Sequence, residues 1–272
     1  MSRPRGLPPR PSRTTSLLDG FLLAVSLFTV LRVPARREPA PMRTALAWST
    51  VVGLGLAAAA GCLLAAARAL LPGTAGALVA ATLAVAALAA MTRGLHLDGL
   101  ADTADGFGRM GGPGRSLEVM HRSDIGPFGV ATLVLTLVLQ IAALARCLTL
   151  DRGLPALLVA VLAGRVAMVR AGTPGVPPAR PDGLGSAVAG SVPRGVALIA
   201  AGVLVVGAAA LPAAFGRPGL GGHLAAGAVA GLVAAELVLH RAVRRFGGVT
   251  GDVFGALCEL ATAAALVVAA LG

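Results

Sequence analysis

The chain has 272 residues, of which 56% are hydrophobic and 13% charged, and its mean hydropathy is +0.84. A soluble domain carries about 25% charged residues, so this composition excludes an ordinary soluble protein and indicates a polytopic membrane protein. The net charge of +11 comes from arginine alone, and because the arginines are scattered between apolar runs without an aromatic stacking platform, no nucleic-acid partner is expected.

The N-terminal part of the chain divides into a basic stretch and a short apolar run. We predict that residues 1–16, which are rich in arginine and proline, form a disordered tail, and that 17–272 form a single integral membrane domain. The apolar run 17–31 is short and has arginine on both flanks, which favours an interfacial or re-entrant helix. Whether it crosses the bilayer is left open by the sequence.

The remaining apolar material comes in runs of membrane-spanning length, separated by Arg, Pro or Gly. Such runs predict an all-α membrane helix bundle and not an alternating-pattern barrel. About seven transmembrane helices are expected, in addition to the short N-terminal helix. They are predicted near 46–71, 76–92, 127–146, 154–170, 195–215, 221–240 and 252–271.

The arginines also predict the orientation of the bundle. If the N-terminus is cytoplasmic and the spans alternate, only four of the 23 arginines lie on the far side: Arg68, Arg146, Arg152 and Arg217. This is the asymmetry that the positive-inside rule describes. We expect the protein in the plasma or inner membrane, with its active site facing the cytoplasm. The longer connections, 33–43, 93–126, 170–194 and 241–251, then all face the cytoplasm.

The connection 93–126 holds five of the chain's 12 acidic residues. Asp98, Asp102 and Asp105 stand at i, i+4 and i+7, so they share one face of a helix. Three carboxylates beside apolar residues are costly unless a cation pairs with them, and Mg²⁺ prefers carboxylate oxygens together with substrate phosphates. We therefore expect a magnesium site that acts on a phosphate or diphosphate. His96 is a candidate base or a structural hydrogen-bonding group. The alternative is a solvated polar helix whose aspartates serve as caps.

A second motif, 120–129, stands directly before a predicted span. Arg122 is a candidate phosphate ligand, and Asp124 a candidate metal ligand or proton acceptor. The alternative is a turn at the membrane surface. On either interpretation we expect Ser123 or Asp124 to cap the following helix.

A third motif, 247–259, opens the last predicted span with a Gly-Gly-Val-Thr-Gly-Asp turn. Helix N-termini favour anions, so Thr250 is a candidate phosphate ligand, and Asp252 is a candidate metal ligand. A glycine turn with an ordinary N-cap is the alternative. Glu259 lies on the same face as Asp252 and deep in an apolar run, so we expect it to have a polar partner.

Further arginines on the predicted cytoplasmic side are weaker candidates. Arg93, Arg165 and Arg180 are possible phosphate ligands, although such residues also mark the cytoplasmic boundary of spans. Glu236 and His240 stand one helical turn apart and are expected to pair.

Taken together, the segments 28–34, 93–106, 125–129 and 247–256 resemble the cobalamin synthase (adenosylcobinamide-GDP ribazoletransferase) family. The resemblance runs in the same order from about residue 17 to the C-terminus, and the His-Leu-Asp-Gly-Leu-Ala-Asp-Thr-Ala-Asp-Gly string is its most specific part. It implies an integral membrane phosphotransferase that requires Mg²⁺. Its substrates would be adenosylcobinamide-GDP and α-ribazole or α-ribazole 5′-phosphate, and its products GMP and adenosylcobalamin or its 5′-phosphate.

The resemblance also implies roles for the residues above. Asp98, Asp102 and Asp105 would hold Mg²⁺ on the diphosphate, and Asp252 would add a ligand from the last helix. The base would be Asp105, Asp124 or His96, and the sequence does not decide among them. Whether the protein forms a homo-oligomer is left open by the sequence.

Other classes of membrane protein are less consistent with the sequence. CDP-alcohol phosphotransferases and membrane prenyltransferases also hold Mg²⁺ and a diphosphate with spaced aspartates, but neither of their full patterns is present. A secondary transporter would place its carboxylates near the midplane of two related halves, whereas here they gather near one membrane face and no repeat is visible.

Overall fold

The computed structural model describes residues 13–33, 42–121 and 124–271. Within these ranges the chain is all-α, and its β-type pairing is limited to one isolated bridge between Pro178 and Val249. The helices are α1 (Arg13–Phe28), α2 (Met42–Leu70), α3 (Gly73–Met91), α4 (Leu95–Gly108), α5 (Pro113–Val119), α6 (Pro127–Thr149), α7 (Gly153–Ala171), α8 (Gly183–Val188), α9 (Arg194–Ala214), α10 (Leu220–Phe246) and α11 (Gly251–Ala269).

Seven of these helices, α2, α3, α6, α7, α9, α10 and α11, are long and apolar enough to cross a membrane. Each corresponds to one predicted span, so the predicted bundle of about seven transmembrane helices is confirmed. The N-terminal apolar helix is also present, and its apolar part, Leu17–Phe28, is shorter than a span. The whole helix, α1, begins at Arg13, four residues before the predicted start of the apolar run. Residues 1–12 of the predicted tail lie outside the described residues.

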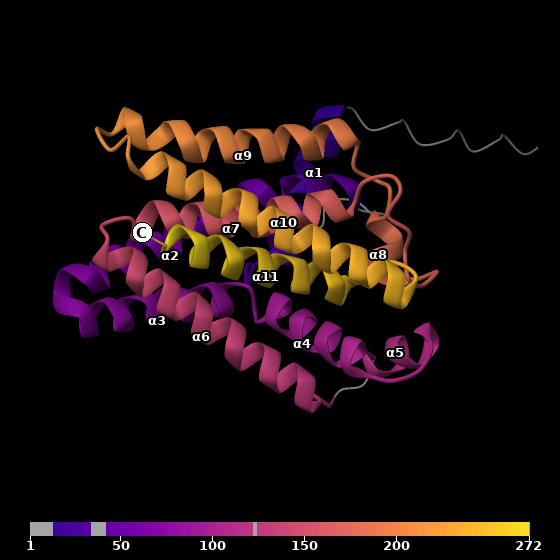
Figure 1. Cartoon of the computed structure of the whole chain (residues 1–272). Coiled ribbons are helices and arrows are strands. Elements are labelled where there is room, and N and C mark those ends of the chain that lie inside the picture. The colour runs from indigo at the N-terminus through magenta and orange to yellow at the C-terminus, as the bar shows by residue number, and fades with distance from the viewer. Residues whose placement is uncertain (1–12, 34–41, 122–123, 272) are drawn as a thin grey trace, which may run out of the picture.

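The centre of the bundle is formed by α7 and α11. Their apolar windows are 72% and 67% buried inside the protein, whereas that of α9 is 22% buried. In Figure 1, α9 accordingly lies at the edge of the bundle, next to α10. A helix this exposed has most of its apolar surface available to lipid.

One end of the bundle collects the segments that carry the sequence motifs. At this end α3, α7 and α10 finish and α6, α9 and α11 begin, and the short helices α4, α5 and α8 lie there (Figure 1). Helix α4 does not span the bundle but packs against α11 and α6. This packing brings the acidic face of α4 to the start of α11.

Candidate active site

A sharp turn between α3 and α4 sets the direction of the acidic helix. Arg93 and Gly94 both have left-handed backbone conformations, with φ of 57° and 67°. Arg93 is exposed, and its guanidinium Nη2 donates to the carbonyl oxygens of Ser26 and Leu27, each at 3.3 Å. Arg93, a predicted phosphate ligand, is therefore placed by the fold against the last turn of α1.

Helices α4 and α11 approach each other closely at two glycines. A Cβ at Gly99 would lie 2.7 Å from the carbonyl oxygen of Asp252, and a Cβ at Gly255 would lie 2.8 Å from that of His96. Both distances are shorter than real Cβ contacts, so only glycine permits this approach. The close crossing is what brings Asp102 beside Asp252.

Asp102 is half-buried on α4 and stands in a strongly negative environment. Burial, and to a smaller extent the nearby charges of Asp252, Asp98 and Asp105, together raise the pKa of its carboxyl group to about 7. Such mutual repulsion is relieved when a cation binds. Asp98 is exposed on the preceding turn of the same face. The carboxylates of Asp98, Asp102 and Asp252 thus have the chemistry of a divalent cation site.

Asp105 is buried and has a different role in the fold. Its Oδ2 accepts a hydrogen bond from the Gly126 amide at 2.7 Å, and its Oδ1 accepts one from the Gly129 amide at 3.0 Å. Gly126 is the N-cap position of α6, so a carboxylate from α4 caps a helix whose N-cap residue lies 21 positions later in the chain. A cation-binding role for Asp105 stays a prediction, and both of its oxygens are already used.

This cap corrects one prediction from the sequence. We expected Ser123 or Asp124 to cap the helix that follows them. The N-cap position of α6 is Gly126 and not Asp124, and the carboxylate of Asp105 supplies the acceptor. Ser123 and the predicted phosphate ligand Arg122 lie outside the described residues. Asp124 is exposed beside the start of α6, and its role as base or metal ligand stays a prediction.

The start of α11 is held by Thr250. Its buried hydroxyl accepts from the Val253 amide at 3.4 Å and donates to Asp252 Oδ2 at 3.1 Å. The preceding residue, Val249, pairs with the loop after α7: its amide donates to the Pro177 carbonyl at 2.9 Å, and its carbonyl accepts from the Ala179 amide at 3.0 Å. This pairing fixes the neighbouring Arg180 close to the α11 N-terminus.

The side chain of Arg180 extends from that loop and contacts α5 and the turn that follows α5. Its Nη1 lies 2.7 Å from His121 Nδ1, and its Nη2 donates to the Leu117 carbonyl. An open cavity of about 470 Å³ results, of the size of a small-ligand site. Its polar lining consists of Asp102, His121, Arg180, Asp182, Thr250 and Asp252. Acidic side chains and the guanidinium of Arg180 therefore face the same space.

His121 and Asp182 were not selected as site residues from the sequence. His121 lies inside the second motif, directly before Arg122. A single histidine in a loop is a weak indication of a binding site. Asp182 stands two residues after Arg180, and the sequence allowed this pair either a phosphate-binding role or a place at the cytoplasmic boundary, without predicting Asp182 itself as a site residue. Their position in the cavity depends on the pairing of the loop 177–179 with Val249, which no local pattern predicts.

Arg165 and His96 lie in the interior of the bundle and do not line the cavity. Arg165 is 3% exposed, and its Nη1 lies 3.0 Å from His96 Nε2. Burial lowers the pKa of His96 well below its ordinary value, and the charge of Arg165 lowers it further. The guanidinium also lies over the Phe28 ring, 5.7 Å from its centroid. Arg165 therefore supports α4 from within the bundle and does not line the cavity, so its phosphate-binding role stays a prediction.

The same interior region contains the expected partner of Glu259. Gln140 Nε2 donates to Glu259 Oε2 at 2.8 Å, which confirms that this partly buried acid has a polar partner. Glu236 was expected to pair with His240, but its ion pair is with Arg170.

Among the described residues, the one compact set of three ligand-type side chains is His96, Cys258 and Glu259. The aspartates of the cavity are more widely spaced, which suits a Mg²⁺ ion that keeps water and substrate phosphate as ligands.

Known proteins resemble the chain over nearly its whole length. A family model described as cobalamin-5-phosphate synthase matches residues 20–270. A relative from Frankia casuarinae is 41% identical over 258 residues, which cover 91% of this chain and 93% of the relative. Relatives from a Nocardioides species and from Stutzerimonas stutzeri are each 41% identical, over 251 and 256 residues. All three are named adenosylcobinamide-GDP ribazoletransferase. No solved structure matches the chain.

Proposed function

Because the chain belongs to the cobalamin-5-phosphate synthase family, we propose that it transfers the adenosylcobinamide phosphate group from adenosylcobinamide-GDP to α-ribazole or its 5′-phosphate, with Mg²⁺ as cofactor. The hydroxyl oxygen of the ribazole forms a bond to the cobinamide-side phosphorus, and the bond from that phosphorus to the bridging oxygen breaks. GMP leaves, and the hydroxyl proton passes to a base. The observation that carries this proposal is the cavity in which Asp102 and Asp252 face Arg180.

The residues of the cavity divide the work on a diphosphate. Asp102 and Asp252, with Asp98, would hold Mg²⁺, which when bound neutralises charge on the diphosphate and the departing phosphate. Arg180 would bind a phosphate oxygen, since its guanidinium is held in place by His121 and the Leu117 carbonyl. Of the three predicted bases, His96 is buried and Asp105 has both oxygens occupied, so the exposed carboxylate of Asp124 is the favoured one.

The distribution of arginines supports a cytoplasmic location for this cavity in the plasma or inner membrane. The cavity lies at the end of the bundle where α7 and α10 finish, and the last turns of these helices carry Arg170, Arg244 and Arg245. The opposite end holds the four arginines of the predicted far side. Adenosylcobinamide-GDP and Mg²⁺ would then reach the cavity from the cytoplasm.

The reaction can be tested by product analysis. Membranes containing the chain are supplied with adenosylcobinamide-GDP and α-ribazole, with and without Mg²⁺, and nucleotide and corrinoid products are separated. We expect GMP to appear in equal amount to a corrinoid that has gained ribazole, and only with Mg²⁺. Absence of GMP with a folded preparation would contradict the proposal. Release of CMP from a CDP-alcohol would favour a lipid phosphotransferase.

Replacing Arg180 with glutamine is expected to weaken use of the diphosphate substrate. A hydrogen bond to a charged group contributes about 1.5–3 kcal/mol, which corresponds to a loss of roughly ten- to a hundredfold in kcat/KM. Initial rates of GMP release give this value. Arg115→Gln is the matched control, because Arg115 is exposed on α5 and does not line the cavity. Equal losses in both variants would remove Arg180 from the site.

The raised pKa of Asp102 predicts a pH dependence of stability when divalent cations are removed. Because the pKa of Asp102 is about 7 in the folded protein and 3.8 ordinarily, the folded state holds its proton more tightly. Its contribution to stability is full below about pH 4 and is lost as the pH rises through about 7. In EDTA, the unfolding temperature of the unmodified chain should therefore fall relative to that of Asp102→Asn as the pH rises from about 5 to about 8, and Mg²⁺ should restore it at the higher pH. Comparing the two proteins at each pH removes the contribution of His96, whose lowered pKa changes stability in the opposite direction in both of them. A constant difference between the two proteins would contradict the assignment.

A further inference from the structure

A second cavity, of about 510 Å³, lies between α7, α9 and α10, apart from the candidate active site. Most of its wall is apolar and includes Val166, Ala201, Leu232 and Leu239. Leu198 of α9 also lines it and is 73% exposed, so the cavity opens sideways at the lipid-facing edge of the bundle. We refer to it as the α9 groove. Its walls can accommodate a hydrocarbon chain.

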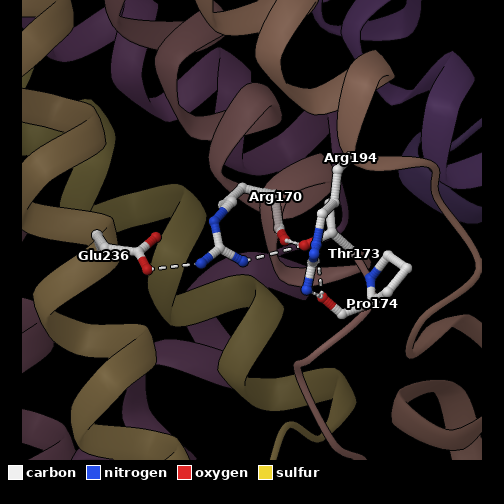
Figure 2. A network of polar contacts seen from close by, with 5 residues as sticks. All are labelled: Arg170, Thr173, Pro174, Arg194 and Glu236. Atoms are coloured by element: carbon white, nitrogen blue, oxygen red, sulfur yellow. Dashed lines mark hydrogen bonds and ion pairs between the residues drawn. The ribbon is translucent and has the colours of Figure 1, made fainter.

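One end of the α9 groove is polar (Figure 2). Arg170 Nη2 forms an ion pair with Glu236 Oε1 at 2.7 Å, and Arg170 Nη1 donates to the Thr173 hydroxyl at 3.0 Å. From the opposite side, Arg194 donates through Nε and Nη2 to the Pro174 carbonyl, at 3.3 and 3.1 Å. The two guanidinium groups thus come from the end of α7 and the start of α9 and are held at the same mouth.

The position and charge of this mouth match a lipid phosphate. Arg170 lies in the last turn of α7 and Arg194 is the first residue of α9, so both stand where the membrane-spanning segments end and headgroups are located. Two arginines face one glutamate, and within the described residues Arg194 Nη1 makes no hydrogen bond. The positive end of the α9 dipole lies at the same place.

We propose that the α9 groove binds an anionic phospholipid, with its phosphate between Arg170 and Arg194 and an acyl chain along α9. The apolar wall distinguishes this ligand from free phosphate, which would gain nothing from the groove. The loop at the mouth, Thr173–Val176, continues directly into the segment that pairs with Val249 and carries Arg180. A bound lipid therefore also stabilises the loop that reaches the candidate active site.

The test is native mass spectrometry of the purified full chain with added phosphatidylglycerol or phosphatidylcholine. We expect preferential retention of phosphatidylglycerol, and a roughly fivefold loss of this preference in Arg194→Gln, since one basic residue near an anionic lipid contributes about that factor. Glu236→Gln removes the competing carboxylate from Arg170 and should increase retention. Arg244→Gln is the control, because Arg244 is exposed on the same end of α10 but does not line the groove.

Arg194→Gln should lower the retention of phosphatidylglycerol and Glu236→Gln should raise it. A general change in packing would not produce these opposite effects. Equal retention of both lipids by the unmodified chain would overturn the proposal, as would equal losses in Arg194→Gln and Arg244→Gln. Displacement of phosphatidylglycerol by inorganic phosphate at millimolar concentration would also overturn it, because the ligand would then be a free anion. Hydrogen exchange at 173–180 provides a second readout: it should slow with phosphatidylglycerol in the unmodified chain and not in Arg194→Gln.

Discussion

Replacing Asp102 with asparagine is expected to lower Mg²⁺-dependent GMP release by about a thousandfold. The change keeps the size of the side chain but removes the charge that lies among Asp98, Asp105 and Asp252. Charge stabilisation by a bound metal ion contributes several kcal/mol to the transition state, and each 1.36 kcal/mol is a factor of ten in rate. The loss should appear in kcat measured at saturating substrate.

The matched control is Asp151→Asn. Asp151 lies in the turn between α6 and α7, at the opposite end of the bundle, and its left-handed φ of 54° is a conformation that asparagine tolerates. We expect activity within about twofold of the unmodified protein, as for a surface substitution away from the site. A similar small effect of Asp102→Asn would exclude Asp102 from the reaction.

The second large effect is expected from Gly99→Ala, a change of one methyl group. The added carbon would meet the Asp252 carbonyl oxygen at 2.7 Å and its Cα at 2.9 Å, and backbone atoms cannot turn aside as a flexible side chain does. Helix α4 must therefore move away from α11. A displacement of about 1 Å at a catalytic site costs on the order of a hundredfold in rate. Kinetics of GMP release and thermal unfolding should be measured together.

A glycine without neighbours provides the control for this experiment. Gly55 lies within α2, and a Cβ added there would have nothing within 4 Å. Gly55→Ala should therefore keep full activity, and helix propensity predicts equal or slightly higher stability. If Gly99→Ala also kept full activity, the close crossing of α4 and α11 would not be needed to assemble the site.

The arrangement of the bundle could be predicted because its determinants are local. Runs of apolar residues with the length of a bilayer mark the seven spanning helices, and the breaks at Pro72 and Gly126 mark ends that the structure confirms. The helical spacing of Asp98 and Asp102 likewise predicted a shared face on what is indeed a helix, α4. Helical periodicity and apolar composition are sufficient to predict features of this kind.

Contacts between distant segments could not be predicted in this way. Asp105 has the same helical spacing as its neighbours, yet it caps α6 because the chain returns Gly126 and Gly129 to it. Arg165 was a candidate phosphate ligand or boundary residue, and its contact with His96, made from the deeply buried helix α7, has no local signal in the sequence. The placement of His121 depends on Arg180, which is 59 residues away. Each case is a tertiary contact between segments whose local patterns are unremarkable in isolation.

The central claim is that Asp102, with Asp98 and Asp252, holds a divalent cation on a diphosphate. The most direct measurement is a titration of the purified chain with Mn²⁺ in the presence of GDP, followed by electron paramagnetic resonance of the free ion. We predict saturable Mn²⁺ binding by the unmodified chain and binding at least about tenfold weaker in Asp102→Asn, as expected when a metal-site residue is lost. Equal Mn²⁺ binding by both proteins would contradict the account.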